Sequence, residues 1–483
     1  MAYFDKAKMS NGTVVDVQDT KGRALADSKL DAAKTELNNT ITTKVNKEAA
    51  ARQEADTAIR SDLTSESNAR ADADSALEMK INNIAETYVN VKKYGAKGDG
   101  ITDDTDSVNR ALNNSGCVYF PKGTYIINSP ILLNDGQSII GDGPGNTIIK
   151  AASSFSGIAV ISTKKFNQIN NIDNGDKEAG FNTIKNITID GSAWNPYYLP
   201  STKSESVPPT VRCGGMFLAG TGFTVDNVKI FNCYTNAIYL NRQQIENWNK
   251  PMNALSKFAN IDIGTCGQHA VHLTGKTNTD TQWVNMHVGN GSCSVNNGYF
   301  NLLIELGANA KFTNCHFASQ YGHKKVKYSV CLSSTASGCV FSNCDIEGSF
   351  DTNLRVENNG NTFTNCRFYA CFGNPGYNIS FSNSASKNIF SACTFSGAAS
   401  DDIFTGSLDW DIGYDGSAIA GSNSYNSFIN CVTSNEKIVY FNSQWKNTIY
   451  IGTCTANKSN FTFESQPTNR AIITGGDNQQ INI

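Results

Sequence analysis

Five ionisable side chains occupy the same place in successive copies of a short repeated sequence. They stand at its fifth position, and they are Asp262, His287, His316, Asp345 and Arg367. Two residues further along, the next position on the same side of the chain holds Glu347 and then Tyr369. Stacked strands lie about 4.8 Å apart, so we expect the residues of this column to touch their neighbours.

The pair Asp345 and Glu347 has the residue types and spacing of a glycosidase site. In a strand their backbones are about 6.7 Å apart and both side chains face the same way. Carboxylate pairs near that separation hydrolyse glycosidic bonds, one as the acid and one as the base or nucleophile.

A second set of strands, one corner further on, supplies more polar residues. Aligning these strands on their apolar positions places Glu305 beside His272 and turns both of them, and Arg355, outward. Glu357 follows two residues after Arg355. We therefore predict that Asp345, Glu347 and Glu357 are catalytic. The predicted substrate-binding residues are Asp262, His287, His316, Glu305, Arg355, Arg367, Tyr369 and Trp410. Trp410 lies in an acidic, aromatic stretch that looks like an inserted loop, and Trp194, Tyr197 and Tyr198 form another exposed-looking aromatic group.

Other interpretations of the column remain open. The outer face of any repeat protein has to be polar, so Asp, His and Arg in a row can form a solvated face of ion pairs. The same residues can also contact a saccharide without cleaving it.

The repeated sequence itself predicts the fold. It reads apolar, any residue, Asn, apolar, any residue, apolar, with clear copies at Phe312–Phe317, Phe341–Ile346 and Phe363–Phe368. The last two apolar positions alternate as in a strand, whereas the first lies three residues before the second. Asn tolerates the left-handed conformation that a corner between them requires. Most copies recur 22 to 33 residues apart, which is typical of a solenoid of stacked coils.

Cysteine is placed regularly in the same repeat. Five of the 14 cysteines share its second apolar position, Cys315, Cys344, Cys366, Cys393 and Cys431. With no CxxC pair matched by a second such pair, we expect reduced core thiols rather than disulfides or a metal site.

The N-terminal part of the chain has a different composition. Residues 1–24 are polar, with a predicted hairpin around Asn11-Gly12, and form a candidate attachment segment. Residues 25–87 lack proline and carry a thin apolar stripe with spacings of seven, four and three, typical of a helix. The sequence Ala55–Ile59 returns, with small changes, 18 residues later at Ala73–Leu77. So thin a stripe predicts a coiled coil; the alternative is a single solvated helix.

The stretch after the helix resembles a known family. Residues 91–150 contain Tyr94–Gly100, Asp103-Asp104-Thr105, Val118–Tyr125 and Ile140–Gly143. This set resembles the start of the right-handed parallel β-helix of the pectate lyase-like superfamily, which implies a mainly β, single-stranded solenoid over residues 88–483. The aspartates there are expected to be structural.

A helical stalk before such a β-helix resembles bacteriophage tailspikes and virion-associated polysaccharide depolymerases. The resemblance implies a homotrimer, a virion location with assembly in the host cytoplasm, and attachment to a phage tail or baseplate protein through the N-terminus. It also implies a bacterial surface polysaccharide as partner. The chain departs from that pattern because no separate C-terminal trimerisation domain is evident.

Composition narrows the partners. Charged residues make up 17% of the chain and the formal net charge is −3, which suggests neither nucleic acid nor an anionic membrane as partner. We expect no membrane insertion, no cofactor and no metal. Cleavage of the polysaccharide by hydrolysis is the leading hypothesis, with a binding-only tail fibre and a polysaccharide lyase as alternatives.

Overall fold

The computed structural model forms two compact units. The first is Met1–Ile84 and the second is Ala85–Ile483. It describes residues 6–16, 20–164, 166, 180–193, 211–241, 256–274, 280–289, 299–318, 326–371, 377–382, 385–396, 410–414, 423–424, 426–433, 439–441, 445–446, 449–454, 461–463, 472–474 and 480–482. No helix among these residues is long and apolar enough to cross a membrane.

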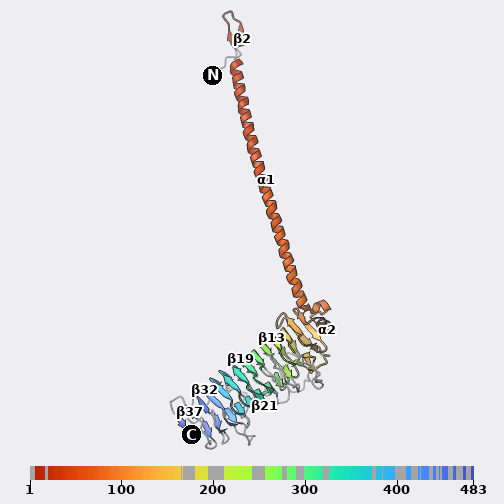
Figure 1. Ribbon diagram of the computed structural model, residues 1–483, viewed down its shortest axis with the longest axis vertical. Coiled ribbons are helices and arrows are strands. Elements are labelled where there is room, and N and C mark those ends of the chain that lie inside the picture. The colour runs from red at the N-terminus through yellow and green to blue at the C-terminus, as the bar shows by residue number, and fades with distance from the viewer. Residues whose placement is uncertain are drawn as a thin grey trace, which may run out of the picture. The chain divides into compact units, whose positions relative to one another are not determined.

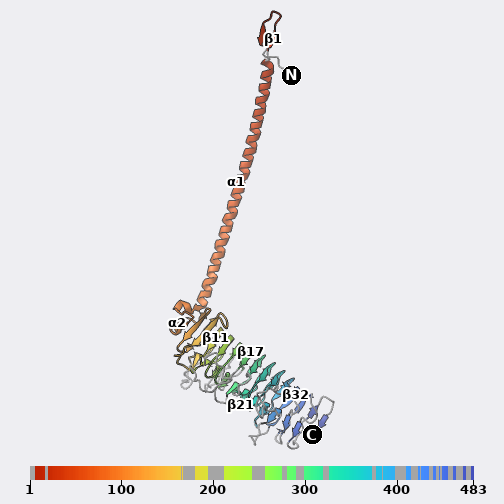
Figure 2. The same ribbon diagram turned by 180° about the vertical axis from the view of Figure 1, so that it is seen from behind.

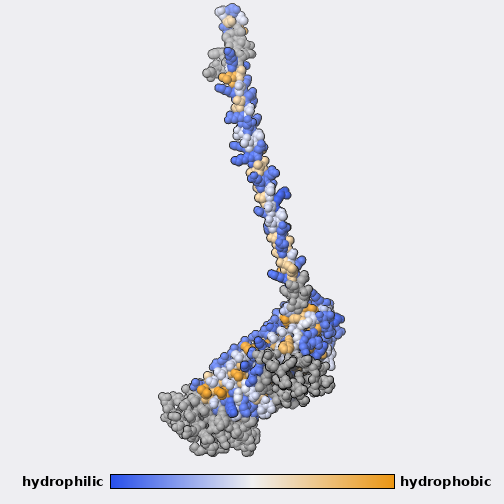
Figure 3. Space-filling view, viewed as in Figure 1, coloured by the Kyte–Doolittle hydropathy of each residue, from blue (hydrophilic) through white to orange (hydrophobic). Residues whose placement is uncertain are grey.

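The first unit is a hairpin followed by one long helix. Strands β1 (Lys6–Lys8) and β2 (Val14–Asp16) pair antiparallel around Asn11-Gly12, which confirms the predicted hairpin. Helix α1 (Thr20–Thr87) runs unbroken for 68 residues and begins five residues before the predicted start (Figure 1). Its large apolar side chains between Leu25 and Met79 are exposed, and Figure 3 shows apolar residues set among hydrophilic ones along the helix.

The second unit opens with a short cap. Strand β3 (Val89–Asn90) leads into a 3-10 turn η1 (Val91–Tyr94), then β4 (Asp99–Asp103) and helix α2 (Thr105–Asn114). The aspartates of this region serve the backbone as expected: Asp104 is buried and accepts hydrogen bonds from the amides of Lys97 at 2.6 Å and Gly98 at 3.0 Å.

After the cap, parallel strands stack coil upon coil, as Figures 1 and 2 show. One twelve-stranded sheet, sheet I, contains β7 (Ile131–Leu133), β10 (Ala159–Thr163), β12 (Gly214–Ala219), β14 (Ile238–Asn241), β16 (Val271–Thr274), β18 (Tyr299–Ala308), β21 (Val326–Ser337), β24 (Thr352–Val356), β27 (Tyr377–Phe381), β30 (Trp410–Tyr414), β33 (Val439–Phe441) and β36 (Phe461–Phe463). The predicted parallel β-helix is confirmed for these coils.

The remaining coil strands form sheet II. They are β5 (Cys117–Phe120), β6 (Gly123–Ile127), β8 (Ser138–Gly141), β9 (Thr147–Ala151), β11 (Thr183–Asp190), β13 (Thr224–Phe231), β15 (Lys257–Ile263), β17 (Gln282–Gly289), β19 (Lys311–Thr313), β20 (His316–Ala318), β22 (Val340–Ser342), β23 (Asp345–Glu347), β25 (Thr362–Thr364), β26 (Arg367–Tyr369), β28 (Ile389–Ser391), β29 (Thr394–Phe395), β32 (Ser427–Thr433) and β35 (Ile449–Cys454). From β11 to β32 they carry the repeated Asn sequence and bend at its third residue.

Two small sheets complete the described strands. β31 (Asn423–Ser424) pairs parallel with β34 (Trp445–Lys446). β37 (Ile472–Thr474) and β38 (Gln480–Asn482) pair antiparallel, so the strand-like sequence near the C-terminus does not simply continue the parallel coils.

Each copy of the repeat turns its corner in the left-handed conformation. The third residue of all nine copies has φ between 52° and 57°, namely Asn186, Asn227, Asn260, Asn285, Asn314, Asn343, Asn365, Ala392 and Asn430. The side chains also form a ladder: Asn227 Nδ2 donates to Asn186 Oδ1 at 2.9 Å and Asn365 Nδ2 to Asn343 Oδ1 at 2.7 Å. The corner therefore lets all three apolar positions face inward.

Aromatic rings and thiols fill the core on the inner side of the corner. Phe312, Phe341, Phe363, Phe390 and Phe428 stack in sequence with ring centroids 4.6 to 4.9 Å apart. The five repeat cysteines beside them are free and buried, as expected. Each thiol donates to a carbonyl one coil back, for example to Phe341 from Cys366 at 3.5 Å.

A second asparagine ladder lies inside the solenoid, and the sequence pattern did not reveal it. Asn361, Asn388 and Asn426 are fully buried. Asn361 Nδ2 donates to Asn388 Oδ1 at 2.8 Å, and Asn388 Nδ2 to Asn426 Oδ1 at 3.0 Å. Because buried amides without partners are costly, this ladder also fixes how successive coils align.

The one corner of the nine without Asn gives a test of this account. Ala392 has φ of 53°, and a left-handed Ala costs about 1–2 kcal/mol where Asn tolerates the conformation better. We expect Ala392→Asn to stabilise the β-helix by about 1 kcal/mol and Asn343→Ala to destabilise it by at least as much. Thermal unfolding at a fixed scan rate measures both, and a fall in Tm for Ala392→Asn would contradict the role of the corner.

Candidate functional site

The predicted column of ionisable residues is present on the outer face of sheet II. Pairing between strands puts Lys229 beside Asp262, Asp262 beside His287, and His287 beside His316. The series continues from His316 to Asp345 and from Asp345 to Arg367. The Asn corner thus gave the correct register over six consecutive coils.

Side chains at the start of the column are linked in one chain of contacts. Lys229 Nζ lies 3.3 Å from Asp262 Oδ2, and His287 Nδ1 lies 3.0 Å from Asp262 Oδ1. The rings of His287 and His316 have centroids 5.2 Å apart. The His287 hydrogen bond is the main cause that holds the pKa of Asp262 below its ordinary value, against the effect of burial. This part of the column is half exposed and available to a ligand.

Further along, Arg367 joins two of the predicted site residues. Its guanidinium contacts Asp345 with two nitrogens, at 3.1 and 2.9 Å, and lies over the ring of Tyr369 with 4.3 Å to the centroid. The Asp345 hydrogen bonds raise the pKa of Arg367 above its ordinary value. A two-pronged pair of this kind holds both groups in a fixed orientation.

Glu347, two residues after Asp345 on the same face as the column, is less exposed than Asp262 and Asp345. Its side chain is 16% exposed, and Oε1 lies 2.7 Å from His316 Nε2. Burial raises the pKa of Glu347, but hydrogen bonds from His316 and Tyr369 outweigh it, so the pKa is lowered overall. The pKa of Tyr369 is raised by burial and by its bond to Glu347. Glu347 is therefore an ionised carboxylate beside two groups that hold protons, an arrangement suited to proton transfer.

The third predicted catalytic acid belongs to a different group of residues. Glu357 directly follows β24 of sheet I, whereas Asp345 and Glu347 lie in β23 of sheet II. Glu357 Oε1 lies 3.1 Å from Arg355 Nε.

Arg355 was predicted to turn outward and to bind substrate. Its neighbours Leu354 and Val356 do face the core, but every residue of β24 is buried, and the Arg355 side chain is only 8% exposed. Burial therefore leaves little of Arg355 accessible to a substrate.

Glu305 was placed in the wrong register. The sequence alignment set it beside His272, whereas the structure pairs His272 with Leu303. Leu302-Leu303-Ile304 fits the same apolar pattern as Ile304-Glu305-Leu306, and the strand has an irregularity between Ile304 and Leu306. Glu305 still reaches His272, with Oε2 at 2.9 Å from Nε2.

An aromatic group around His272 was not predicted as a site. The ring of Tyr239 stacks on that of His272, 4.6 Å away and parallel within 2°. His269 lies 5.1 Å from His272 and is buried, and burial lowers its pKa to about 3. Its Nδ1 accepts a hydrogen bond from the Phe300 amide at 3.0 Å. His269 is thus a neutral structural residue, and the signal for this group was the aligned Tyr239 and His272 of sheet I.

Trp410 lies in strand β30 and not in an inserted loop, because it pairs with Tyr377 of β27 in sheet I. The prediction of a loop there was wrong. The side chain of Trp410, and residues Trp194, Tyr197 and Tyr198, lie outside the described part of the structure. Among the described residues no three His, Cys, Asp or Glu side chains are placed to hold a metal ion.

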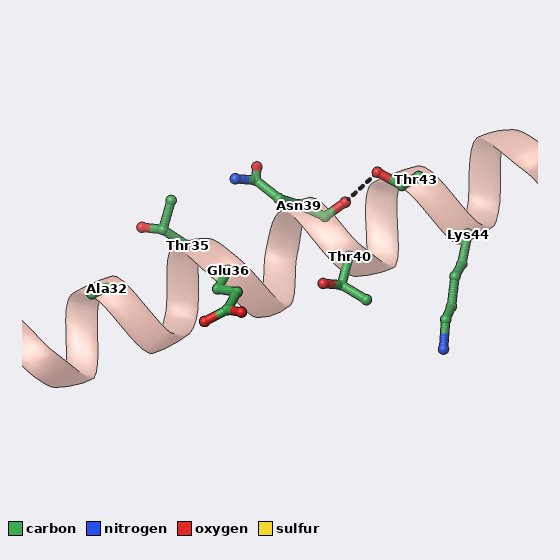
Figure 4. Close-up of a pocket in the computed structure, with 7 residues that line it drawn as sticks. All are labelled: Ala32, Thr35, Glu36, Asn39, Thr40, Thr43 and Lys44. Atoms are coloured by element: carbon green, nitrogen blue, oxygen red, sulfur yellow. Dashed lines mark hydrogen bonds between the residues drawn. The ribbon is translucent and has the colours of Figure 1, made fainter.

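A hollow on α1 is a weaker candidate. It is lined by Ala32, Thr35, Glu36, Asn39, Thr40, Thr43 and Lys44 of one helix (Figure 4). Thr35 and Thr43 use their hydroxyls to donate to the carbonyls of Asp31 and Asn39, both at 2.7 Å. A single helix offers a ligand contacts from one side only, so we place the candidate site on sheet II.

Comparisons with known proteins agree with the fold. Residues 88–212 match the family described as Rhamnogalacturonase A/epimerase, pectate lyase-like. A probable glucan endo-1,3-beta-glucosidase of Arthroderma benhamiae is 37% identical over 119 residues, which are 22% of this chain and 14% of that protein. The pre-neck appendage protein of Bacillus phage phi29 is 39% identical over 70 residues, 14% of this chain and 8% of that protein. The chain therefore spans only a small part of these relatives.

A solved structure extends the similarity to most of the chain. The Dettilon tailspike protein superposes with a TM-score of 0.54 at 11% identity, covering 78% of this chain and 69% of that one. At this identity the match shows the fold. Residues 88–212 are thus similar to a pectate lyase-like family, and the chain has a parallel β-helix fold similar to that of this tailspike.

The environment of Glu347 predicts a pH dependence. A carboxyl whose pKa is lowered on folding contributes stability above its unfolded pKa, near 4.3, and loses that contribution as the pH falls through the folded value. We expect the wild-type Tm to fall between pH 6 and pH 3 more steeply than that of Glu347→Gln. Parallel curves of Tm against pH for the two proteins would contradict the assigned contacts of Glu347.

Proposed function

We propose that this chain is a phage tailspike that binds a bacterial surface polysaccharide and cleaves it by hydrolysis at the column of sheet II. The observation that carries the proposal is the enclosed carboxylate of Glu347, bonded to His316 and Tyr369. The phage appendage relative and the glucosidase relative support a polysaccharide-acting phage protein.

The contacts divide the catalytic roles. Glu347 is ionised and acts as the base that activates water, or as the nucleophile. His316 and Tyr369, which contact it, are the nearest proton-holding groups for the leaving oxygen. Asp345, the second carboxylate of the predicted pair, is held by Arg367 and takes part by orienting the sugar ring and stabilising positive charge in the transition state.

The rest of the column supplies binding contacts on either side. Asp262, His287 and Arg367 offer donors and acceptors on neighbouring coils about 4.8 Å apart. The partly exposed ring of Tyr369 and the cation above it provide a surface for stacking a sugar. In this proposal the saccharide runs along the solenoid axis and crosses several coils.

A binding-only tail fibre is the second candidate, and one observation favours it. Asp262, Asp345 and Glu347 each already have a basic partner within 3.3 Å. Such a face of ion pairs is also what a solvated surface without catalysis requires. Glu305, which reaches His272, and the more exposed Glu357 remain candidate binding groups in either case.

The assembly follows the same proposal. We place the chain in the virion, assembled in the host cytoplasm as a homotrimer through α1, with residues 1–24 attaching to a phage tail or baseplate protein. The exposed apolar side chains of α1 support this, because a long helix with an unburied stripe gains stability by packing.

Cleavage is tested by incubating the purified full chain with host surface polysaccharides and sizing the products. We expect new reducing ends, and a loss of about 100-fold or more in rate for Glu347→Gln and for Asp345→Asn. The matched control is Asp226→Asn on the outer side of the same sheet before the corner, where Asp226 pairs with Lys185 at 3.9 Å. It should keep full activity.

Three results would contradict parts of this proposal. Unchanged cleavage by Glu347→Gln would show that the catalytic site is not at the column of sheet II. Products that absorb ultraviolet light as unsaturated uronides would replace hydrolysis with a lyase reaction. Binding of host polysaccharide without cleavage by the wild type would favour the binding-only tail fibre over the enzyme.

The assembly is tested by the mass of the full chain in solution. The expected result from light scattering is three times the chain mass of 52.2 kDa. Removal of the apolar stripe by Ile41→Ser and Ile59→Ser should shift the distribution toward single chains. A wild-type mass of one chain at micromolar concentration would contradict the trimer.

A further inference from the structure

The apolar stripe of α1 has a feature beyond its length. Ile41, Val45, Ile59, Leu63 and Leu77 are 49% to 65% exposed in the described chain. Ile41, Ile59 and Leu77 are each 18 residues apart, and so are Val45, Leu63 and Ile81. Five turns of an α-helix contain about 18 residues and span about 27 Å.

This period determines the path of the stripe. A strict seven-residue repeat drifts around a straight helix by about 20° per repeat, and the helices supercoil to keep it facing a partner. An 18-residue repeat returns to the same side of a straight helix. The stripe of α1 therefore runs parallel to the helix axis.

Two ion pairs lie on the stripe itself. Glu48 contacts Arg52 at 2.5 Å, and Glu66 contacts Arg70 at 2.7 Å, again 18 residues later. At about 100° per residue, Glu48 and Arg52 stand about 20° to either side of Ile41. Along the axis the stripe is thus apolar, then charged, then apolar, then charged, then apolar.

We propose that this stripe is an interface with parallel, in-register copies of the same chain, forming a straight bundle without supercoil, in which the two Glu–Arg layers set the register. The inference rests on the proposed assembly of identical chains and adds its geometry. Only a helix with the same repeat of about 27 Å matches apolar to apolar and charged to charged layers along the whole length.

The charged layers act chiefly against wrong alignments. Exposed pairs of this kind contribute little to stability on their own. A slip of about two helical turns would place Glu48 and Arg52 of one chain against Ile41 and Val45 of the next. Charged groups without a partner are strongly unfavourable in an interface. A slip of one whole repeat keeps the layers matched but removes one repeat of contacts.

The path of the interface is tested with single cysteines in the full chain. Leu77→Cys and Ile59→Cys lie on the straight stripe, whereas Ala76→Cys lies where a seven-residue repeat counted from Ile41 would place the interface. Thr43→Cys, on the opposite side of α1, is the outward control. Under mild oxidation we expect Leu77→Cys and Ile59→Cys to form at least fivefold more cross-linked dimer than the other two. The unsubstituted chain corrects for its own cysteines.

Two outcomes would overturn the straight interface. Cross-linking of Ala76→Cys above Leu77→Cys would show a supercoiled heptad interface, and equal cross-linking of all four would show no defined interface. The proposed assembly is judged separately by the mass of the same variants. A mass of one chain refutes the assembly. A trimer in which Ala76→Cys cross-links more than Leu77→Cys refutes only the straight geometry.

The register is tested with mixed chains that carry Leu30→Cys and Leu37→Cys, which are seven residues apart on α1 and meet only after a slip of about two helical turns. We expect no mixed cross-links with the charged layers present. They should appear when all four charged residues are replaced by leucine, Glu48→Leu, Arg52→Leu, Glu66→Leu and Arg70→Leu. Mixed cross-links before replacement, or none after it, would show that the layers do not set the register.

Discussion

The left-handed corner of the repeat is the constraint on which the rest of the β-helix depends. Because the corner residue adopts φ near 53°, the strand bends without losing its pairing, and three apolar side chains face the core. The amide side chains then bond from one coil to the next. Backbone conformation, core packing and coil alignment thus follow from one residue type at one position.

The alignment of the coils also determines the chemistry of the surface. A slip of one residue would turn each outward side chain of sheet II inward. The Phe stack and the buried thiols, which bond to the carbonyls of the preceding coil, oppose such a slip. Asp345, Arg367, His316 and Glu347 can therefore meet across coils that are distant in the sequence.

The neighbours of an outward residue could be predicted from the sequence only where its strand carries the Asn of the repeat. In sheet II the Asn identifies the position of every neighbour, and the predicted column from Asp262 to Arg367 was correct. Sheet I has no such marker, so two apolar triplets in β18 fitted equally well and Glu305 was misplaced. The burial of Arg355 was not predictable. The alternation of apolar and polar residues shows which side chains point away from the core, but not whether other residues cover them. The buried amides of Asn361 and Asn388 were missed because the repeat pattern scored polar residues as exposed.

The central claim is that the column of sheet II is the saccharide site. A crystal structure of the Glu347→Gln protein with an oligosaccharide from the host polysaccharide tests it most directly. The account predicts a sugar chain along sheet II, with one glycosidic oxygen within hydrogen-bond distance of residue 347 or its neighbours His316 and Tyr369. A sugar bound instead on sheet I, around Tyr239 and His272, would contradict it.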